Sequence, residues 1–310
     1  MRKFRYSLAV VLGLPLIFTG AEGADRAAAS GLAKIAPSNF VHASARPWQT
    51  QCEWNDADGK ARVSLTEGRD RPDTKVVPAT AGCRQVRRFA FPSGASISET
   101  RYQLERPAPV QSDASAKLVY AAHGRARHEL GGAPFASEPR DAFIQTPGQA
   151  RKITATSADY VEIAMNLLDL PQGEAGNTGA LDKGHGDVLQ HRDVAPVDIC
   201  FVDAKNTVMR KAANAAIIPA DAPCFLIYGY GRLKRGGYTF LEVEAKKGSK
   251  TIPHPEDEDT ITYYVKGRVR ATIGGETQEM GPGDAIFEPR GVPHADEFLE
   301  DTIQIEFKLP

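Results

Sequence analysis

A histidine that follows a short motif of glycine and proline is the residue best placed to do chemistry in this chain. Gly283 is followed by five residues, Pro289, one residue, Gly291, two residues and His294. The apolar run 285–287 lies between Gly and Pro on both sides, so the segment predicts a strand, a turn and a histidine on the next strand. An imidazole fixed in this way is a common metal ligand. Neighbouring elements must then supply the rest of the site.

This spacing resembles the second motif of the cupin family, whose members are small β-barrels that often hold a metal. The agreement extends to all four fixed positions, although Phe298 stands where an Asn often closes the motif. The family's first motif, counted back from Gly267, falls on His254, Glu256 and Thr260. The resemblance covers roughly residues 236–310, and it implies a jelly-roll barrel there.

The resemblance also implies a metal site of altered composition. Cupins usually place three His and one Glu around a divalent ion, whereas His254, Glu256 and His294 are the candidate ligands that remain here. Two His and one carboxylate are a ligand set for non-haem Fe(II), with positions left open for substrate or oxygen. A divalent Fe, Mn, Ni or Zn ion is the implied cofactor. In the other interpretation, the acidic run 256–259 is a solvated loop, and Thr260 removes the family's carboxylate ligand.

A predicted strand at 260–265 would line the substrate pocket. Alternation places Thr260, Thr262 and Tyr264 on one face, and the resemblance puts Thr260 at an inward position. Tyr264 is then a candidate catalytic acid or base. We predict a protein that binds a small molecule, and a divalent metal, in this barrel. The alternative is a metal-dependent oxygenase, isomerase or lyase acting on a small carboxylated or oxygenated substrate.

An internal repeat indicates two barrels of one ancestry. Residues 120–127 (YAAHGRAR) correspond to 263–270 (YYVKGRVR), and 141–144 (DAFI) to 284–287 (DAIF), both at an offset of 143. Each half then ends on an alternating apolar strand with one buried face. The predicted fold class is all-β, with two tandem cupin jelly-roll barrels. The predicted organisation is a signal peptide at 1–23, an N-terminal extension at 24–44, a degenerate cupin domain at 45–168, a Gly-rich linker at 169–192 and a C-terminal cupin domain at 193–310.

The predicted linker contains a group of possible metal ligands. Flexible Gly-rich chain gives ligands no fixed geometry, so solvated loop residues are the favoured interpretation. The residues concerned are Asp182, His185, Asp187 and His191.

In the first half the same offset changes the chemistry. Subtracting 143 from the four motif positions gives Gln111, Asp113, Lys117 and Arg151. Neither Lys nor Arg binds a divalent ion at neutral pH, so this barrel is predicted to be free of metal. Lys117 and Arg151 could form an anion pocket. The favoured alternative is that Asp113 pairs with Lys117 and plugs a degenerate barrel.

The N-terminus and the cysteines predict a periplasmic or secreted protein. Residues 1–23 have a basic start, an apolar run and small residues before a possible cleavage site, which is the layout of a signal peptide. The four cysteines allow three pairings. The repeat selects disulfides within each half, Cys52 with Cys83 and Cys200 with Cys224, and such bonds persist in oxidising compartments.

Composition limits the partners. The formal net charge is -1, which argues against a general nucleic-acid binder or a binder of membrane surfaces. A small-molecule ligand is therefore the expected partner, with no nucleic acid and no membrane after signal cleavage. Because two linked barrels already form an internal pseudo-dimer, we expect a monomer.

Overall fold

The computed structural model describes residues 38–57, 61–67, 77–78, 80–104, 108, 110–111, 113–167, 188–201, 208–214, 216–219, 222–232 and 238–310. The predicted signal peptide and most of the predicted linker, including Asp182, His185 and Asp187, lie outside these residues. Within the described part of the chain, no helix is long and apolar enough to span a bilayer.

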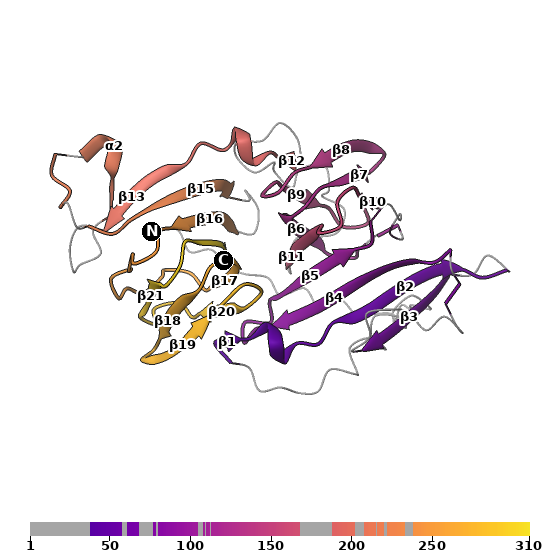
Figure 1. Cartoon of the computed structure of the whole chain (residues 1–310), viewed down its shortest axis with the longest axis horizontal. Coiled ribbons are helices and arrows are strands. Elements are labelled where there is room, and N and C mark those ends of the chain that lie inside the picture. Colours follow the sequence, from indigo (N-terminus) through magenta and orange to yellow (C-terminus); the bar gives the residue numbers. More distant parts are fainter. Residues whose placement is uncertain are drawn as a thin grey trace, which may run out of the picture. The chain divides into compact units, whose positions relative to one another are not determined.

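The described residues form an all-β fold, as predicted (Figure 1). In the first half the strands are β1 (Phe40–Val41), β2 (Gln49–Asn55), β3 (Ala61–Glu67), β4 (Gly82–Ala90), β5 (Ser96–Tyr102), β6 (Ala116–His123), β7 (Ala126–Leu130), β8 (Ala133–Ser137), β9 (Ala142–Gln145), β10 (Arg151–Ala155) and β11 (Val161–Leu167). In the second half they are β12 (Val188–Leu189), β13 (Val197–Phe201), β14 (Val208–Arg210), β15 (Cys224–Arg232), β16 (Thr239–Ala245), β17 (Thr260–Lys266), β18 (Val269–Ile273), β19 (Glu276–Met280), β20 (Ala285–Glu288), β21 (His294–Phe298) and β22 (Thr302–Lys308). The helical pieces are two 3₁₀ turns, Ala43–Ala45 and His191–Asp193, and the short helix α2 (Lys211–Asn214).

Each barrel combines a large and a small antiparallel sheet. Among the described residues, the first barrel has the order β12-β9-β6-β11-β5-β4-β2-β3 in its eight-stranded sheet and β10-β7-β8 in its three-stranded sheet. The second barrel has the orders β1-β20-β17-β22-β16-β15-β13-β14 and β19-β18-β21. The two sheets of a barrel enclose its interior, which is where a jelly-roll holds a ligand.

The internal repeat is confirmed strand by strand. β18 begins 143 residues after β7 (269 against 126), and the same offset relates β19 to β8, β20 to β9 and β21 to β10. Equivalent strands of the two barrels also share the same pattern of buried and exposed residues, as in β8 and β19. Even the turn before the last of these strands is reproduced, with φ of 73° at Gly148 and 74° at Gly291. The halves are therefore two copies of one fold.

Each barrel receives a short strand from the segment that precedes the other barrel. β1, within the predicted N-terminal extension, pairs with β20 of the second barrel, and β12 pairs with β9 of the first. The amide of Ala43 then donates to Asp284 Oδ1 at 2.7 Å, and the amide of His191 donates to Asp141 Oδ1 at 2.8 Å. The sequence predicts loop throughout 169–192, whereas its last residues form β12 and a 3₁₀ turn, because Leu189 is buried in the core.

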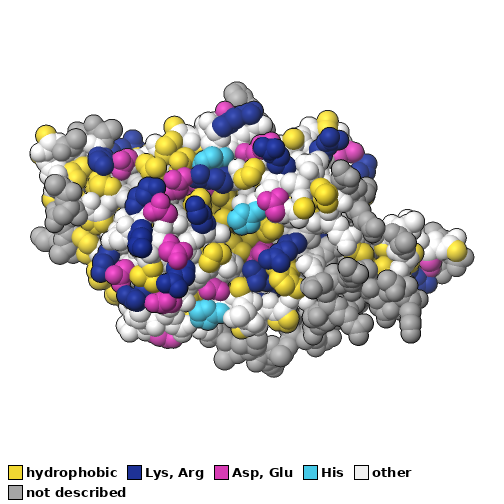
Figure 2. Space-filling view, viewed as in Figure 1, with side chains coloured by type: hydrophobic (Ala, Val, Ile, Leu, Met, Phe, Trp, Pro, Cys, Tyr) yellow, Lys and Arg dark blue, Asp and Glu magenta, His cyan; other side chains and the backbone are white. Residues whose placement is uncertain are grey.

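A shared hydrophobic core joins the barrels. One cluster of buried residues includes Phe89 and Tyr120 from the first barrel and Tyr263 and Phe307 from the second. The rings of Phe89 and Tyr263 meet edge to face with centroids 6.1 Å apart. On the face shown in Figure 2, Lys and Arg side chains lie among Asp and Glu side chains, in keeping with the formal net charge of -1.

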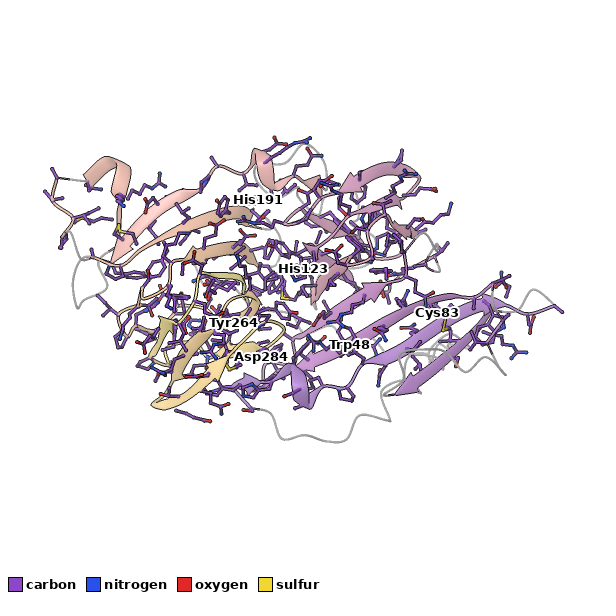
Figure 3. The ribbon with its side chains drawn as sticks, viewed as in Figure 1. Trp48, Cys83, His123, His191, Tyr264 and Asp284 are labelled. Atoms are coloured by element: carbon purple, nitrogen blue, oxygen red, sulfur yellow. A yellow bond between two sulfur atoms is a disulfide. The ribbon has the colours of Figure 1, made fainter. Side chains whose placement is uncertain are left out.

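Both predicted disulfides are confirmed. Cys52 on β2 bonds Cys83 on β4 (Figure 3), and Cys200 on β13 bonds Cys224 on β15. In each pair the two cysteines lie directly opposite one another on neighbouring strands. The bonds thus clamp corresponding strand pairs in the two barrels.

Candidate metal and ligand site

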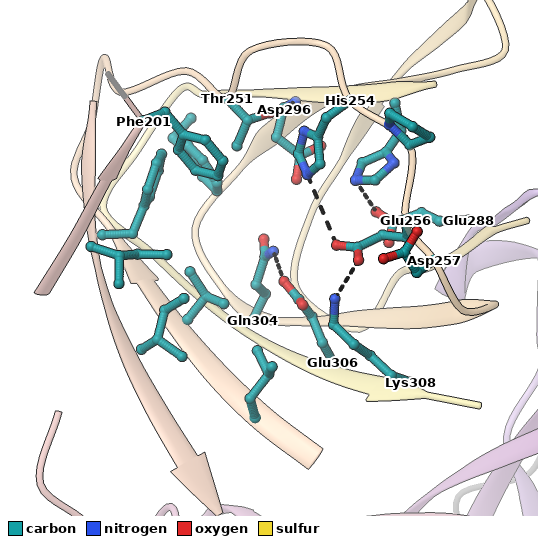
Figure 4. Close-up of a pocket in the computed structure, with 18 residues that line it drawn as sticks. Phe201, Thr251, His254, Glu256, Asp257, Glu288, Asp296, Gln304, Glu306 and Lys308 are labelled. Atoms are coloured by element: carbon teal, nitrogen blue, oxygen red, sulfur yellow. Dashed lines mark hydrogen bonds and ion pairs between the residues drawn. The ribbon is translucent and has the colours of Figure 1, made fainter. Parts of the chain in front are cut away.

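The second barrel encloses a cavity of about 300 Å³ with one apolar and one polar wall (Figure 4). The apolar wall consists of Ile199, Phe201, Phe225, Ile227, Leu241, Val243 and Phe298. The polar wall includes Thr251, His254, Glu256, Asp257, Glu288, His294, Asp296, Gln304, Glu306 and Lys308. A cavity of this composition suits a small molecule with an apolar body and a polar end.

Strand alternation brings the polar side chains together. On β22, Gln304, Glu306 and Lys308 are two residues apart and therefore face the same side. On β21 the same alternation directs His294 and Asp296 inward, and both are buried.

The three predicted metal ligands meet in this cavity. His254 and His294 are bridge partners whose amides donate to each other's carbonyls at 3.0 and 2.9 Å, and their ring centroids are 4.4 Å apart. His254 Nε2 lies 3.9 Å from Glu256 Oε1. One ligand atom from each of the three residues lies within 4.8 Å of the others. The sequence motifs thus predict which side chains converge.

Hydrogen bonding leaves His254 ready to act as a ligand. Its Nδ1 lies 2.7 Å from the carbonyl of Ile252. A carbonyl can only accept, so Nδ1 carries the proton and Nε2 keeps its lone pair. Burial, together with the neighbouring His254, lowers the pKa of His294 to about 4. The imidazole of His294 is therefore neutral at neutral pH, which is the form that binds metal.

The cavity holds more carboxylates than cations. Burial raises the pKa of Asp296 to about 7, and Glu306 adds to the effect. Burial also raises the pKa of Glu288 well above its usual value. Lys308 supplies an ammonium group, 2.5 Å from Glu256 Oε2. Five carboxylates thus share one lysine among the described residues that line the cavity.

Sequence reasoning missed most of this acidic wall. Glu306 and Lys308 alternate with Ile305 and Phe307, whose apolar period identified the strand, so the opposite face of that strand was the available signal. Glu288 lies within the second motif itself, directly before Pro289. Each could have been found by reading the polar face of a strand whose apolar face was already assigned.

The predicted substrate wall differs from the observed one. Thr260, Thr262 and Tyr264 share an interior face of β17 and are fully buried, but none of them is among the residues that line the cavity. Tyr264 lies in the hydrophobic cluster with Val243 and Phe298, which do line it. The polar wall instead comes from β20, β21, β22 and the segment 251–257. Burial raises the pKa of Tyr264 well above its usual value, so the phenol keeps its proton at neutral pH.

The residues that replace metal ligands in the first barrel are paired. Lys117 Nζ lies 2.7 Å from Asp113 Oδ1, as in the plugged-barrel interpretation. Arg151 forms a two-pronged pair with Glu162, at 3.2 and 3.0 Å, and its guanidinium also donates to Gln111. Both cations therefore already have anionic partners from their own barrel. His191, predicted to be a solvated linker residue, contacts Tyr230 instead, with Nδ1 3.0 Å from the phenol oxygen.

His128 should make the first barrel sensitive to acid. Burial lowers the pKa of His128 from 6.5 to about 4, and the ring stacks on Phe135. Between pH 6.5 and about pH 4, His128 is protonated in the unfolded chain but neutral in the folded chain. The unfolding free energy therefore falls as the pH falls through this window. From about pH 7.5 to about pH 5 we expect this histidine alone to cost about 2 kcal/mol of unfolding free energy.

The measurement is denaturant unfolding of the wild type and of His128→Phe at both pH values. The variant loses the hydrogen bond to Ser137 and should be less stable at the higher pH. The difference in unfolding free energy between the wild type and the variant should then be about 2 kcal/mol smaller at the lower pH. If this difference in unfolding free energy is the same at both pH values, the lowered pKa of His128 is contradicted.

Comparison with known proteins supports the fold. Residues 240–303 match the family described as Cupin domain. AerE from Microcystis aeruginosa has a similar structure, with a TM-score of 0.52 at 9% identity over 73% of this chain and 92% of that chain. Ylba from E. coli gives 0.51 at 10% identity over 73% and 83%.

Oxalate decarboxylase OxdC from Bacillus subtilis gives a TM-score of 0.49 at 14% identity over 74% of this chain and 73% of that chain. No curated protein sequence matches this chain. The family match lies within the second barrel, and the first barrel repeats the same fold, so the chain contains a Cupin domain and has the fold of two tandem cupin barrels.

Proposed function

We propose that the second barrel holds a divalent metal ion through His254, Glu256 and His294 and binds a small molecule beside it. The observation that carries this proposal is the convergence of the three ligand atoms within 4.8 Å at the polar end of the cavity. Two histidines and one carboxylate leave coordination positions free for an exogenous ligand.

The charges around the cavity fit a cation. Glu288 and Asp296 are buried, Glu256 and Glu306 are half-buried, and the ammonium of Lys308 is the cation that lines the same space. Buried carboxylates without positive partners are strongly unfavourable. A divalent ion would supply part of the missing positive charge, so the donor set and its surroundings both suit a metal.

The protein's own groups have distinct tasks at such a site. Lys308 holds one oxygen of Glu256, which leaves the other oxygen facing His254. The Ile252 carbonyl fixes the tautomer of His254. The apolar wall would bind the body of the small molecule and exclude water from its polar end. When bound, the metal would supply Lewis acidity toward an oxygen or nitrogen atom of that molecule.

Replacing His294 with alanine should abolish metal binding. Purified wild-type protein is expected to carry about one equivalent of a divalent metal per chain, and the variant to carry almost none, because the site would lose one of its two histidine ligands. The measurement is elemental analysis of protein purified without chelators. Exposed His123 lies outside the cavity, so His123→Ala is the matched control and should keep the full equivalent. Metal-free wild-type protein with an intact fold would end this proposal.

We also infer that the protein is exported. Two disulfides link its strands, and such bonds persist mainly in oxidising compartments. The predicted signal peptide would supply the route. Fusing residues 1–30 to a reporter that works only outside the cytoplasm would test this, and an inactive reporter would count against export.

A further inference from the structure

The strand register places a buried carboxylate beside the position where the second barrel has lost one. Thr260 occupies the place of the glutamate in the first motif, and Glu288 lies directly opposite it across the β17–β20 pair. Directly opposite residues on antiparallel strands share a face, with Cβ atoms about 4.5–5.5 Å apart. A carboxylate on β20 can therefore reach the same part of the barrel as one on β17.

Glu288 is directed at the three candidate ligands. Its side chain is buried, lines the cavity and places Oε1 3.9 Å from His294 Nε2. The hydroxyl of Thr262 donates to the other oxygen at 3.4 Å. Figure 4 shows Glu288 next to Glu256 at the polar end of the cavity. One carboxylate oxygen is thus oriented by the protein, while the other faces the histidines.

Glu288 lacks a permanent cationic partner among the described residues. The ammonium of Lys308 pairs with Glu256 instead. The ion-pair contact of Glu288 is with the imidazole of His294, which is charged only if protonated. A buried carboxylate in this situation needs either a proton or a cation. A divalent ion between the histidines would be that cation.

We propose that Glu288 is a fourth protein ligand of the divalent ion, replacing from β20 the carboxylate that Thr260 removes from β17. This inference rests on the proposed metal site at His254, Glu256 and His294. Thr262 then acts as a positioning residue that holds one oxygen of Glu288 and leaves the other for the ion. The site would have two histidines and two carboxylates, in place of the usual three histidines and one glutamate.

The test titrates manganese(II) into metal-stripped protein and reads the free ion by electron paramagnetic resonance. Glu288→Gln keeps the size of the side chain and removes its charge, and it should weaken binding at least tenfold. The matched control is Glu306→Gln, which removes a carboxylate from the same cavity without removing a proposed ligand. Because Glu306 contributes charge but no proposed ligand, its variant should lose clearly less affinity than Glu288→Gln, about threefold.

Thermal unfolding gives a second test of Glu288. If Glu288 had only a structural role, the order of melting temperatures of wild type and variant would not depend on metal. Without metal, Glu288→Gln should melt at or above the wild-type temperature, because the neutral amide replaces a buried carboxyl group that has to bind a proton in the absence of a cation. With saturating manganese(II) the order should reverse, because the wild type gains more from binding. Equal losses of affinity in Glu288→Gln and Glu306→Gln, or wild-type affinity in Glu288→Gln, would overturn the assignment of Glu288 alone. Failure of the wild type to bind any ion would instead refute the proposed metal site.

Discussion

Replacing Arg151 with alanine should lower the unfolding free energy by about 3–5 kcal/mol. Both partners of the Arg151–Glu162 pair are almost fully buried, with side-chain exposures of 3% and 2%. Burial alone would raise the pKa of Glu162, but Arg151 and the hydroxyls of Tyr160 and Tyr102 hold that pKa below its usual value. Without the guanidinium, an ionised carboxylate would remain in the core with two phenol donors and no cation.

The matched control is the neighbouring residue on the same strand. Lys152 pairs with Glu129 at 2.9 Å, but the two side chains are 57% and 44% exposed. Lys152→Ala should therefore cost less than about 1 kcal/mol. Denaturant unfolding of both variants gives the comparison. A loss below about 1 kcal/mol for Arg151→Ala would mean that the pair contributes no more than a surface contact.

The buried pair also shows why the first barrel could be only partly predicted. The offset of 143 correctly places Arg151 where His294 stands in the second barrel, since β10 and β21 are equivalent. The offset does not identify Glu162 as the partner of Arg151. Glu162 lies on β11, and the offset between β11 and its equivalent strand in the second half is no longer 143. β22 begins 141 residues after β11 (302 against 161). The Lys117–Asp113 contact was predictable because both residues belong to one short segment.

The fold was predictable because the repeat is local and regular. The motif glycines, the alternating strands and the cysteine pairs each act within one half, so sequence spacing reports on them directly. The exchange of β1 and β12 between the barrels was not predictable. It depends on contacts between segments that lie in different halves, such as Phe40 with Ile286 and Val188 with Phe143, and two-residue strands carry almost no periodicity.

The sequence identified three side chains that converge, but it did not identify most of the carboxylates around them. His254, Glu256 and His294 belong to motifs, and the barrel brings motifs together. The roles of Glu288 and Glu306 depend on which strands face the cavity, and this is set by the packing of Phe225, Val243 and Phe298. Thr260, Thr262 and Tyr264 are buried but do not line the cavity. A cross-strand replacement such as Thr260 by Glu288 becomes visible only once the register is known.

Gly267 lies in the turn after β17, where neighbouring backbone atoms leave no room for a side chain. Its φ is +83°, in the region that favours glycine. A Cβ added there would lie 2.6 Å from the carbonyl oxygen of Asp301 and 2.8 Å from Thr302 Cα, so backbone atoms would have to move. The equivalent Gly124 has φ of +67° and equally close backbone atoms of Tyr160. Both barrels thus need a glycine where this turn passes the start of the last strand.

Replacing Gly267 with alanine should therefore cost about 3–5 kcal/mol. Roughly 1–2 kcal/mol comes from the backbone conformation and the remainder from the steric overlap with Asp301 and Thr302. Gly94 separates the two contributions, because it has the same φ of +83° with no atom within 4 Å of an added Cβ. Gly94→Ala should cost only about 1–2 kcal/mol. The measurement is the unfolding free energy of both variants in denaturant. If both variants lose the same unfolding free energy, the backbone conformation would account for the whole cost. The overlap with Asp301 and Thr302 would then contribute nothing to it.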